Sequence, residues 1–237
     1  IGANIDIDAN LSPLQLNDLL PEAHGSMRGR LTLRGPRNTP DVDVDLRGDG
    51  IVFGQYRAER FLAKGRLPWR NGNGSLSIDA QGLQAGVPLT SLQLALRGAV
   101  ERLQFDATAY GDIGKLALGG DADKQGTRWR GTLASMAFDP ELGPTWTLQA
   151  PARWSWDGGD GALSPACLRS ADGGELCANA DWPRRGVDLA GEKLSLALVV
   201  PYLPERADGR PWALHGDINL TATIRPAGNA WRGSATI

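Results

Sequence analysis

The feature that most constrains this chain is the alternation of apolar and polar residues along short segments. Residues 41–47 read Asp-Val-Asp-Val-Asp-Leu-Arg, so that Val42, Val44 and Leu46 share one side and the charged residues share the other. Successive side chains of a β-strand point to opposite faces of its sheet. The pattern therefore predicts strands that have one apolar face and one solvated face.

The same alternation recurs in several other parts of the chain, and it defines a set of residues that we assign to one common apolar face. That set is Leu31, Leu33, Val42, Val44, Leu46, Leu76, Ile78, Leu92, Leu94, Leu96, Phe105, Leu194, Leu196, Leu198, Ile218 and Leu220. Turn signals such as Asn71-Gly72 separate the segments, and together they predict roughly fifteen strands. A flat sheet rarely exceeds about ten strands, so we expect an all-β fold whose sheet curls over on itself.

Alternation does not decide whether the apolar face is closed or open. The same residues would form the core of a β-sandwich, or they would line a long groove that holds acyl chains or apolar peptide segments. Both arrangements produce the same pattern, and both stay open on this observation alone.

One short helix is expected near the start of the chain. Ser12 is a suitable N-cap, Pro13 suits the first helical position, and Gln15 follows the cap by three residues. An apolar stripe continues until Pro21, which would end the helix. We therefore predict a helix over residues 13–20.

A loose internal repeat links the two ends of the chain. Leu-Pro-Glu occurs at 20–22 and again at 203–205, and each copy is followed by His-Gly, at 24–25 and at 215–216. Two copies of one unit would suit an array that stacks, although chance similarity explains so short a match equally well.

Composition narrows the classes of partner. The 25 Lys and Arg residues nearly balance the 27 Asp and Glu residues, and no basic stripe is visible, so nothing favours nucleic acid. Trp makes up 8 of the aromatic residues against 4 Phe, which suits sites with one apolar and one wet side but also a plain core. The longest apolar run, residues 196–200, is far shorter than the roughly 18 residues of a spanning helix. We expect the chain to be one segment of a larger protein that carries its anchor elsewhere.

The two cysteines, Cys167 and Cys177, flank a turn signal at Asp172-Gly173. A hairpin over about residues 166–178 would bring the cysteines close enough to bridge, which implies an oxidising compartment. Two buried thiols remain the alternative. Their spacing is not that of a zinc site, and no His lies nearby.

The remaining candidates for chemistry are weak. His24 and His215 have no metal ligand at a suitable spacing, and no nucleophile elbow, P-loop or dinucleotide fingerprint occurs. Asp41, Asp43 and Asp45 would suit a calcium site in a secreted β-helical carbohydrate enzyme, but their spacing is that of a solvated strand face. We therefore expect no enzyme activity, no cofactor and no metal.

Several segments in order resemble the TamB-like family. A Gly-bounded strand at 29–35 is followed by a Pro-led strand from Pro40 and a short strand over 50–54, and the pattern continues through 57–67. The cysteine hairpin followed by Trp182, and the two Leu-Pro-Glu elements, also resemble that family. The similar segments cover about two thirds of the chain.

The resemblance implies a fold and a set of partners. TamB-like proteins are AsmA-like, are anchored in the inner membrane of Gram-negative bacteria and extend through the periplasm. The resemblance implies one elongated β domain over residues 1–237, a taco-shaped or β-helix-like curled sheet with an apolar concave groove. It also implies work with a TamA-type outer-membrane barrel protein. Phospholipid acyl chains in the groove would make the protein a lipid carrier. Nascent outer-membrane β-barrel proteins, paired through an edge strand, would make it a chaperone instead.

Overall fold

The computed structural model describes residues 3–18, 20–204, 206, 210, 212–228 and 230–237, and the fold is all-β as predicted. The chain divides into two compact units, Ile1–Lys124 and Gln125–Ile237. That the whole chain acts as one elongated domain stays a prediction.

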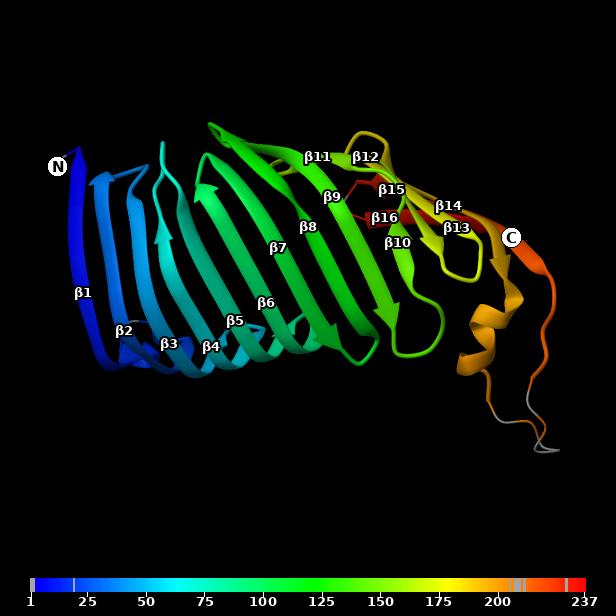
Figure 1. The fold of residues 1–237 in the computed structure, drawn as a ribbon, viewed down its shortest axis with the longest axis horizontal. Coiled ribbons are helices and arrows are strands. Elements are labelled where there is room, and N and C mark those ends of the chain that lie inside the picture. Colours follow the sequence, from blue (N-terminus) through cyan, green and yellow to red (C-terminus); the bar gives the residue numbers. More distant parts are fainter. Residues whose placement is uncertain (1–2, 19, 205, 207–209, 211, 229) are drawn as a thin grey trace. The chain divides into compact units, whose positions relative to one another are not determined.

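Eight antiparallel strands form the first unit, and each pairs with the next one along the chain, as the blue-to-green ribbons of Figure 1 show. Their lengths lie between 10 and 14 residues. The strands are β1 (Asn4–Gln15), β2 (Ala23–Pro36), β3 (Asp41–Phe53), β4 (Tyr56–Leu67), β5 (Gly74–Ala85), β6 (Val87–Ala99), β7 (Arg102–Gly111) and β8 (Gly114–Gln125).

The second unit contains another eight strands, with one interruption in the simple order. Both β10 and β11 pair with β9 on one side and with β12 on the other, so they form two pieces of one strand position. From β12 to β16 each strand again pairs with the next. The strands are β9 (Arg128–Pro140), β10 (Trp146–Leu148), β11 (Ala152–Asp157), β12 (Asp160–Ser170), β13 (Glu175–Trp182), β14 (Gly186–Ser195), β15 (Asp217–Ala227) and β16 (Ala230–Thr236).

The strand register places the apolar residues of the first unit in rows across the sheet. One such row contains an apolar residue or a glycine on every strand that it crosses. In chain order it consists of Ala9, Leu31, Val44, Gly65, Leu76, Leu96, Phe105 and Gly120. Directly opposed residues share a face, so this face of the sheet is apolar from β1 to β8.

A left-handed residue keeps the apolar face continuous where the strands bend. In β3, Gly50 has φ +60°, and a Cβ added at Gly48 would lie 3.0 Å from Cγ1 of Ile51. Ile51 therefore folds back over the apolar side of Gly48, although a regular strand would place these two residues on opposite faces. The bend also shifts the register against β2 by one residue, as a β-bulge does.

The same device occurs in the second unit. In β14, Lys193 has φ +51°, and a Cβ added at Gly191 would lie 2.6 Å from Cδ1 of Leu194. The register between β14 and β15 shifts between these two residues. In both units the large apolar side chain after the bend covers a glycine before it.

The predicted helix over residues 13–20 is wrong. Pro13 lies inside β1, at the register shift between Leu11 and Leu14, and only Leu16–Asp18 form a single 3-10 turn, η1. Proline lacks the N–H that a sheet ladder needs, and it is tolerated in strands at bulges and edges. Leu19 lies outside the described residues. The same Leu-Ser-Pro sequence at 163–165 also marks a register shift, between β12 and β13.

The strand expected at Leu194, Leu196 and Leu198 is also only partly right. Leu194 belongs to β14, whereas the other two lie in a 3-10 helix, η2 (Leu196–Tyr202), where Ala197 N donates to Ser195 Oγ at 3.2 Å. None of the helices in the described residues is long or apolar enough to cross a membrane.

The two helices give the loose repeat a structural counterpart. Each follows a strand that ends at a bulge, and each precedes one of the Leu-Pro-Glu copies. Gly25 and Gly216, which follow the two histidines, have φ +100° and +105°. Glu205, in the second copy, lies outside the described residues. The described parts of the two connections thus share a 3-10 helix and a left-handed glycine after the histidine.

Candidate functional site

The apolar face of the sheet is not sealed beneath a second layer. Within the described residues, no large side chain is fully buried, and the buried hydrophobic residues are mostly alanines. Val44, with 8% of its surface exposed, is the one predicted face residue that is buried. In a closed β-sandwich the inner faces of two sheets interdigitate, and the large apolar side chains are the most buried ones.

The total surface area supports the same conclusion. The chain exposes 15369 Å², whereas a compact monomer of its 25.2 kDa mass exposes about 10,300 Å². The large apolar side chains that are only half-buried contribute to this excess. Apolar side chains that a globular domain would bury are therefore left reachable.

The first unit brings together all eleven of the face residues predicted for it. The register aligns Leu31 and Leu33 with Val44 and Val42, and it continues the rows to Phe105. Residues on the same face that sequence reasoning missed include Ile7, Leu11, Met27, Phe61, Leu67, Leu103, Leu116 and Leu118. Ala or Gly occupies neighbouring positions on the same face of these strands, and this weakened the apolar alternation in the sequence.

The second unit brings together three of the five residues predicted for it. Leu194 pairs with Ile218, and Gly191 pairs with Leu220, so these positions share a face. Missed residues of the same face include Leu163, Leu168, Leu176, Val187 and Leu189. Leu196 and Leu198 lie in η2, outside this strand register.

Ion pairs cover the opposite, polar face of the first unit. The Lys64 ammonium lies 3.1 Å from Asp45, and the Arg66 guanidinium lies 3.8 Å from Asp41. Each of these side chains is at least 41% exposed. The aspartate row thus has the neighbours of a solvated strand face. A hollow of about 310 Å³ on the same sheet is lined mainly by polar-face residues of β5, β6 and β7.

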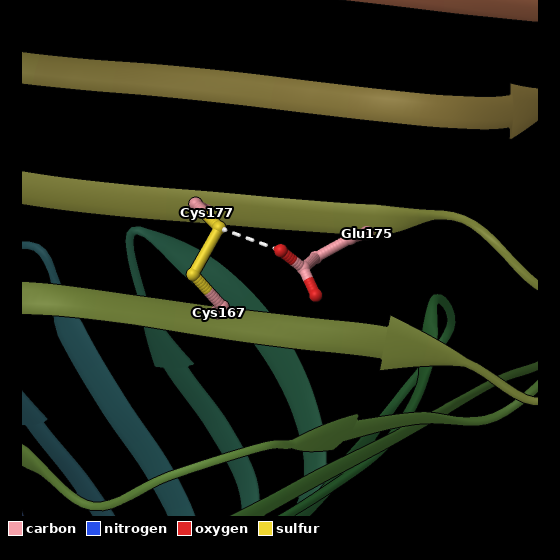
Figure 2. Close-up of side chains that lie close together, drawn as sticks. All are labelled: Cys167, Glu175 and Cys177. Atoms are coloured by element: carbon pink, nitrogen blue, oxygen red, sulfur yellow. Dashed lines mark hydrogen bonds between the residues drawn. A yellow bond between two sulfur atoms is a disulfide. The ribbon is translucent and has the colours of Figure 1, made fainter.

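The predicted disulfide is confirmed. Cys167 on β12 and Cys177 on β13 are directly opposed, with their Cα atoms 4.0 Å apart, and their sulfurs are bonded (Figure 2). Their neighbours Ala166 and Leu168 belong to the apolar face, so the disulfide lies on the other face.

Glu175 stands beside the disulfide. Its Oε1 lies 3.5 Å from the sulfur of Cys177, the contact that Figure 2 draws as a dashed line. A disulfide sulfur has no proton to donate, so this hydrogen bond requires the reduced thiol. Among the described residues these three side chains are close enough to hold a metal ion, but the bonded sulfurs cannot act as thiolate ligands.

Comparisons with known proteins agree on one family. Residues 1–231 match the family model described as TamB, N-terminal domain. The chain is 24% identical over 152 residues to the translocation and assembly module subunit TamB of Haemophilus influenzae. That match covers 62% of this chain and 12% of the relative, so the chain spans a small part of that protein. No solved structure matches the chain.

Proposed function

Because this chain belongs to the TamB N-terminal domain family, we propose that its apolar face carries phospholipid acyl chains between the inner and outer membranes. The chain would be a periplasmic segment of a larger protein that is anchored in the inner membrane. It would work with a TamA-type outer-membrane barrel protein and contribute to outer-membrane assembly. It would act as a scaffold and not as an enzyme.

The observation that carries this proposal is the apolar face that no second layer covers. Rows of Leu, Ile, Val and Ala extend across neighbouring strands of the first unit, and nearly all of the large side chains are half-buried. Transfer of each lipid CH₂ out of water onto such a surface is worth about 0.8 kcal/mol. A chain of a dozen or more CH₂ groups is therefore held without any specific polar contact.

The two faces have different tasks in this account. Charged pairs on the polar face keep a long open sheet in solution, and the apolar face provides a surface of uniform chemistry along which a tail is able to slide. A left-handed residue bends the strand where Ile51 covers Gly48 and where Leu194 covers Gly191. Such bends favour a curled sheet with the apolar face on its concave side.

The test is lipid co-purification. The chain is expressed in a Gram-negative host, purified without detergent and extracted, and phospholipid is counted per protein by mass spectrometry. Leu94→Glu places a charge on the apolar face, whereas Gln93→Glu places the same charge on the polar face of the same strand. We expect the first variant to lose bound lipid and the second to retain the wild-type amount. Equal lipid in both variants, or none in the wild type, would contradict the proposal.

The chaperone remains the second candidate, and β16 is the observation that favours it. This strand pairs with β15, and all of its residues are exposed. A strand edge of this kind is able to pair with an extended partner segment through backbone hydrogen bonds. Under this alternative, Ser234→Pro would abolish binding of an unfolded barrel protein while Leu94→Glu would leave it unchanged. Ser234→Ala is the control.

The carbohydrate enzyme is a third and more distant candidate. It requires hydrolysis or elimination of a polysaccharide that disappears in Asp43→Asn. A turnover with this dependence would overturn both binding proposals.

A further inference from the structure

A row of tryptophans crosses the apolar face of the second unit at one end of its strands. Trp129 on β9 is directly opposed to Trp156 on β11, and Trp182 on β13 is opposed to Gly161 on β12. A Cβ added at Gly161 would lie 2.9 Å from the ring of Trp156. The glycine thus leaves the space that this ring occupies, and the row continues across four strands.

A fourth tryptophan, on β16, contacts the end of this row. The ring of Trp231, on β16, stacks on that of Trp182 with centroids 4.1 Å apart and planes 24° from parallel. In a flat sheet, three strand spacings of about 4.8 Å would separate the backbones of β13 and β16. The stack therefore reaches across the apolar face over β14 and β15. Trp231 remains 65% exposed, so the row presents indole surface to solvent.

Charge differs between the two ends of these strands. The end with the tryptophans carries four aspartates (Asp157, Asp160, Asp181 and Asp188), each ion-paired with an arginine (Arg128, Arg184, Arg185 and Arg225), and it also carries Arg130 and Arg232. The opposite end carries two cations (Arg169 and Lys193) and six acids (Asp139, Glu141, Asp172, Glu175, Glu192 and Asp217). Strand alternation places Arg128, Arg225 and Arg232 on the polar face, so they act through the net positive charge of this end of the strands, whereas the opposite end is net negative. An anionic group is therefore favoured at the tryptophan end and disfavoured at the other.

Polarity thus changes in steps along the strands, from a charged rim through a row of indoles to aliphatic side chains. Indole is an amphipathic group that prefers the boundary between an apolar and a wet environment. From Gly161 to the end of β12 the strand extends about 30 Å at 3.3 Å per residue, which is about twice the tail length of one bilayer leaflet. A whole lipid tail fits along it.

We propose that the row of Trp129, Trp156, Trp182 and Trp231 is the site for the glycerol and phosphate region of one phospholipid. The inference rests on the proposed lipid-carrying function. The tails lie along the strands toward Leu168, Leu176 and Leu220, and the phosphate lies at the arginine rim. The row thus fixes the direction in which a lipid lies in this unit.

The test uses phosphatidylethanolamine that carries a nitroxide, which quenches Trp fluorescence at short range, either at the headgroup or near the end of one chain. Lipid occupancy is measured independently by mass spectrometry. At equal occupancy we expect stronger quenching by the headgroup label. The variant Trp156→Phe/Trp182→Phe/Trp231→Phe should lose most of the headgroup quenching while its occupancy falls little.

Trp146 provides the matched control, because β10 places it beside Phe138 and Ser170 at the opposite end of the strands. Trp146→Phe should reduce quenching by the chain-end label and leave the headgroup quenching unchanged. Should the triple variant fail to fold, the exposed Trp231→Phe alone should lower headgroup quenching. Equal quenching by both labels, or loss of chain-end quenching in the triple variant, would overturn the inference while the carrier function stands. A wild-type chain without lipid would instead overturn the proposed function.

Discussion

The two units build the same kind of apolar face by different means. The first consists of strands of 10 to 14 residues in an unbroken meander, and its face is mainly aliphatic, with Phe61 and Phe105 as aromatic members. The second has strands as short as 3 residues and one strand position divided between β10 and β11. It also holds the disulfide and seven of the 8 tryptophans, all but Trp69.

The difference teaches how an open sheet becomes stable without a second layer. Each cross-strand pair contributes roughly 0.2–1 kcal/mol, so long strands in register accumulate stability from many small terms. Short or interrupted strands accumulate fewer. In the second unit a covalent cross-link and contacts between large aromatic side chains provide part of the stability that long strands provide in the first unit. Substitutions in one unit should therefore destabilise that unit more than the other.

The largest effect is expected at a glycine where two strands of the first unit approach closely. Gly65 has φ +139°, and its Cβ would lie 2.1 Å from the Ser75 carbonyl oxygen. Gly65→Ala should lower the free energy of unfolding by about 3 kcal/mol or more, because both the backbone and the neighbouring strand must shift. Gly159→Ala is the control, since nothing lies within 4 Å of its Cβ position. Urea unfolding of both variants is the measurement, and similar midpoints would contradict this account.

The next largest loss of stability is expected in the second unit, when its disulfide is removed. Cys167→Ala/Cys177→Ala opens a loop with a sequence separation of 10 residues, and it should cost roughly 2–3 kcal/mol in the chain-entropy model. Hydrogen exchange should then increase in β12 and β13 and stay unchanged in β2 to β6. Exchange that increases equally in both units would mean that the cross-link does not serve the second unit in particular.

A smaller loss of stability should distinguish the two Leu-Ser-Pro bulges when their serines are replaced. Ser164 Oγ accepts a hydrogen bond from the backbone N–H of Arg153 at 2.8 Å, whereas no such bond of Ser12 is present among the described residues. Ser164→Ala should cost about 1 kcal/mol, and Ser12→Ala should be nearly neutral. Thermal unfolding of the two variants checks this order. A larger loss for Ser12→Ala would reverse our interpretation of the bulges.

The smallest effect is expected on the polar face. Lys64 and Asp45 form an ion pair whose side chains are 73% and 54% exposed. A double-mutant cycle with Lys64→Gln and Asp45→Asn should give a coupling of roughly 0.2–1 kcal/mol that falls with added salt. A coupling of several kcal/mol would show that the polar face contributes to stability as well as to solubility.

The strands were predictable from the sequence because a strand with one face in water has polar residues at every second position, and this alternation is a local property. Ser12-Pro13 misled the prediction because Ser, Pro and Gln at this spacing fit a helix start as well as a bulge. The second Leu-Ser-Pro, at 163–165, was the available signal, since no helical stripe follows it. Leu196 and Leu198 misled the prediction because alternate leucines fit a strand. Ser195, which caps η2, was the available signal for a helix start.

The bends and the tryptophan row were beyond sequence reasoning for a different reason. Between Gly48 and Ile51 the left-handed Gly50 exchanges the faces to which odd and even positions point. A strict period of two therefore assigns the later residues of the strand to the wrong face. Trp129 and Trp156 lie on separate strands, and only the register shows that they are opposed. Register depends on non-local pairing, which local patterns do not report.

The central claim is that a lipid tail reaches the apolar face of the folded chain. The most direct measurement places a photo-crosslinking benzophenone amino acid at Leu94, on that face, or at Gln93, on the other, and irradiates the chain in living cells. Mass spectrometry of the purified protein should then show a phospholipid adduct at position 94 and none at position 93. No adduct at either position, or equal adducts at both, would contradict the account.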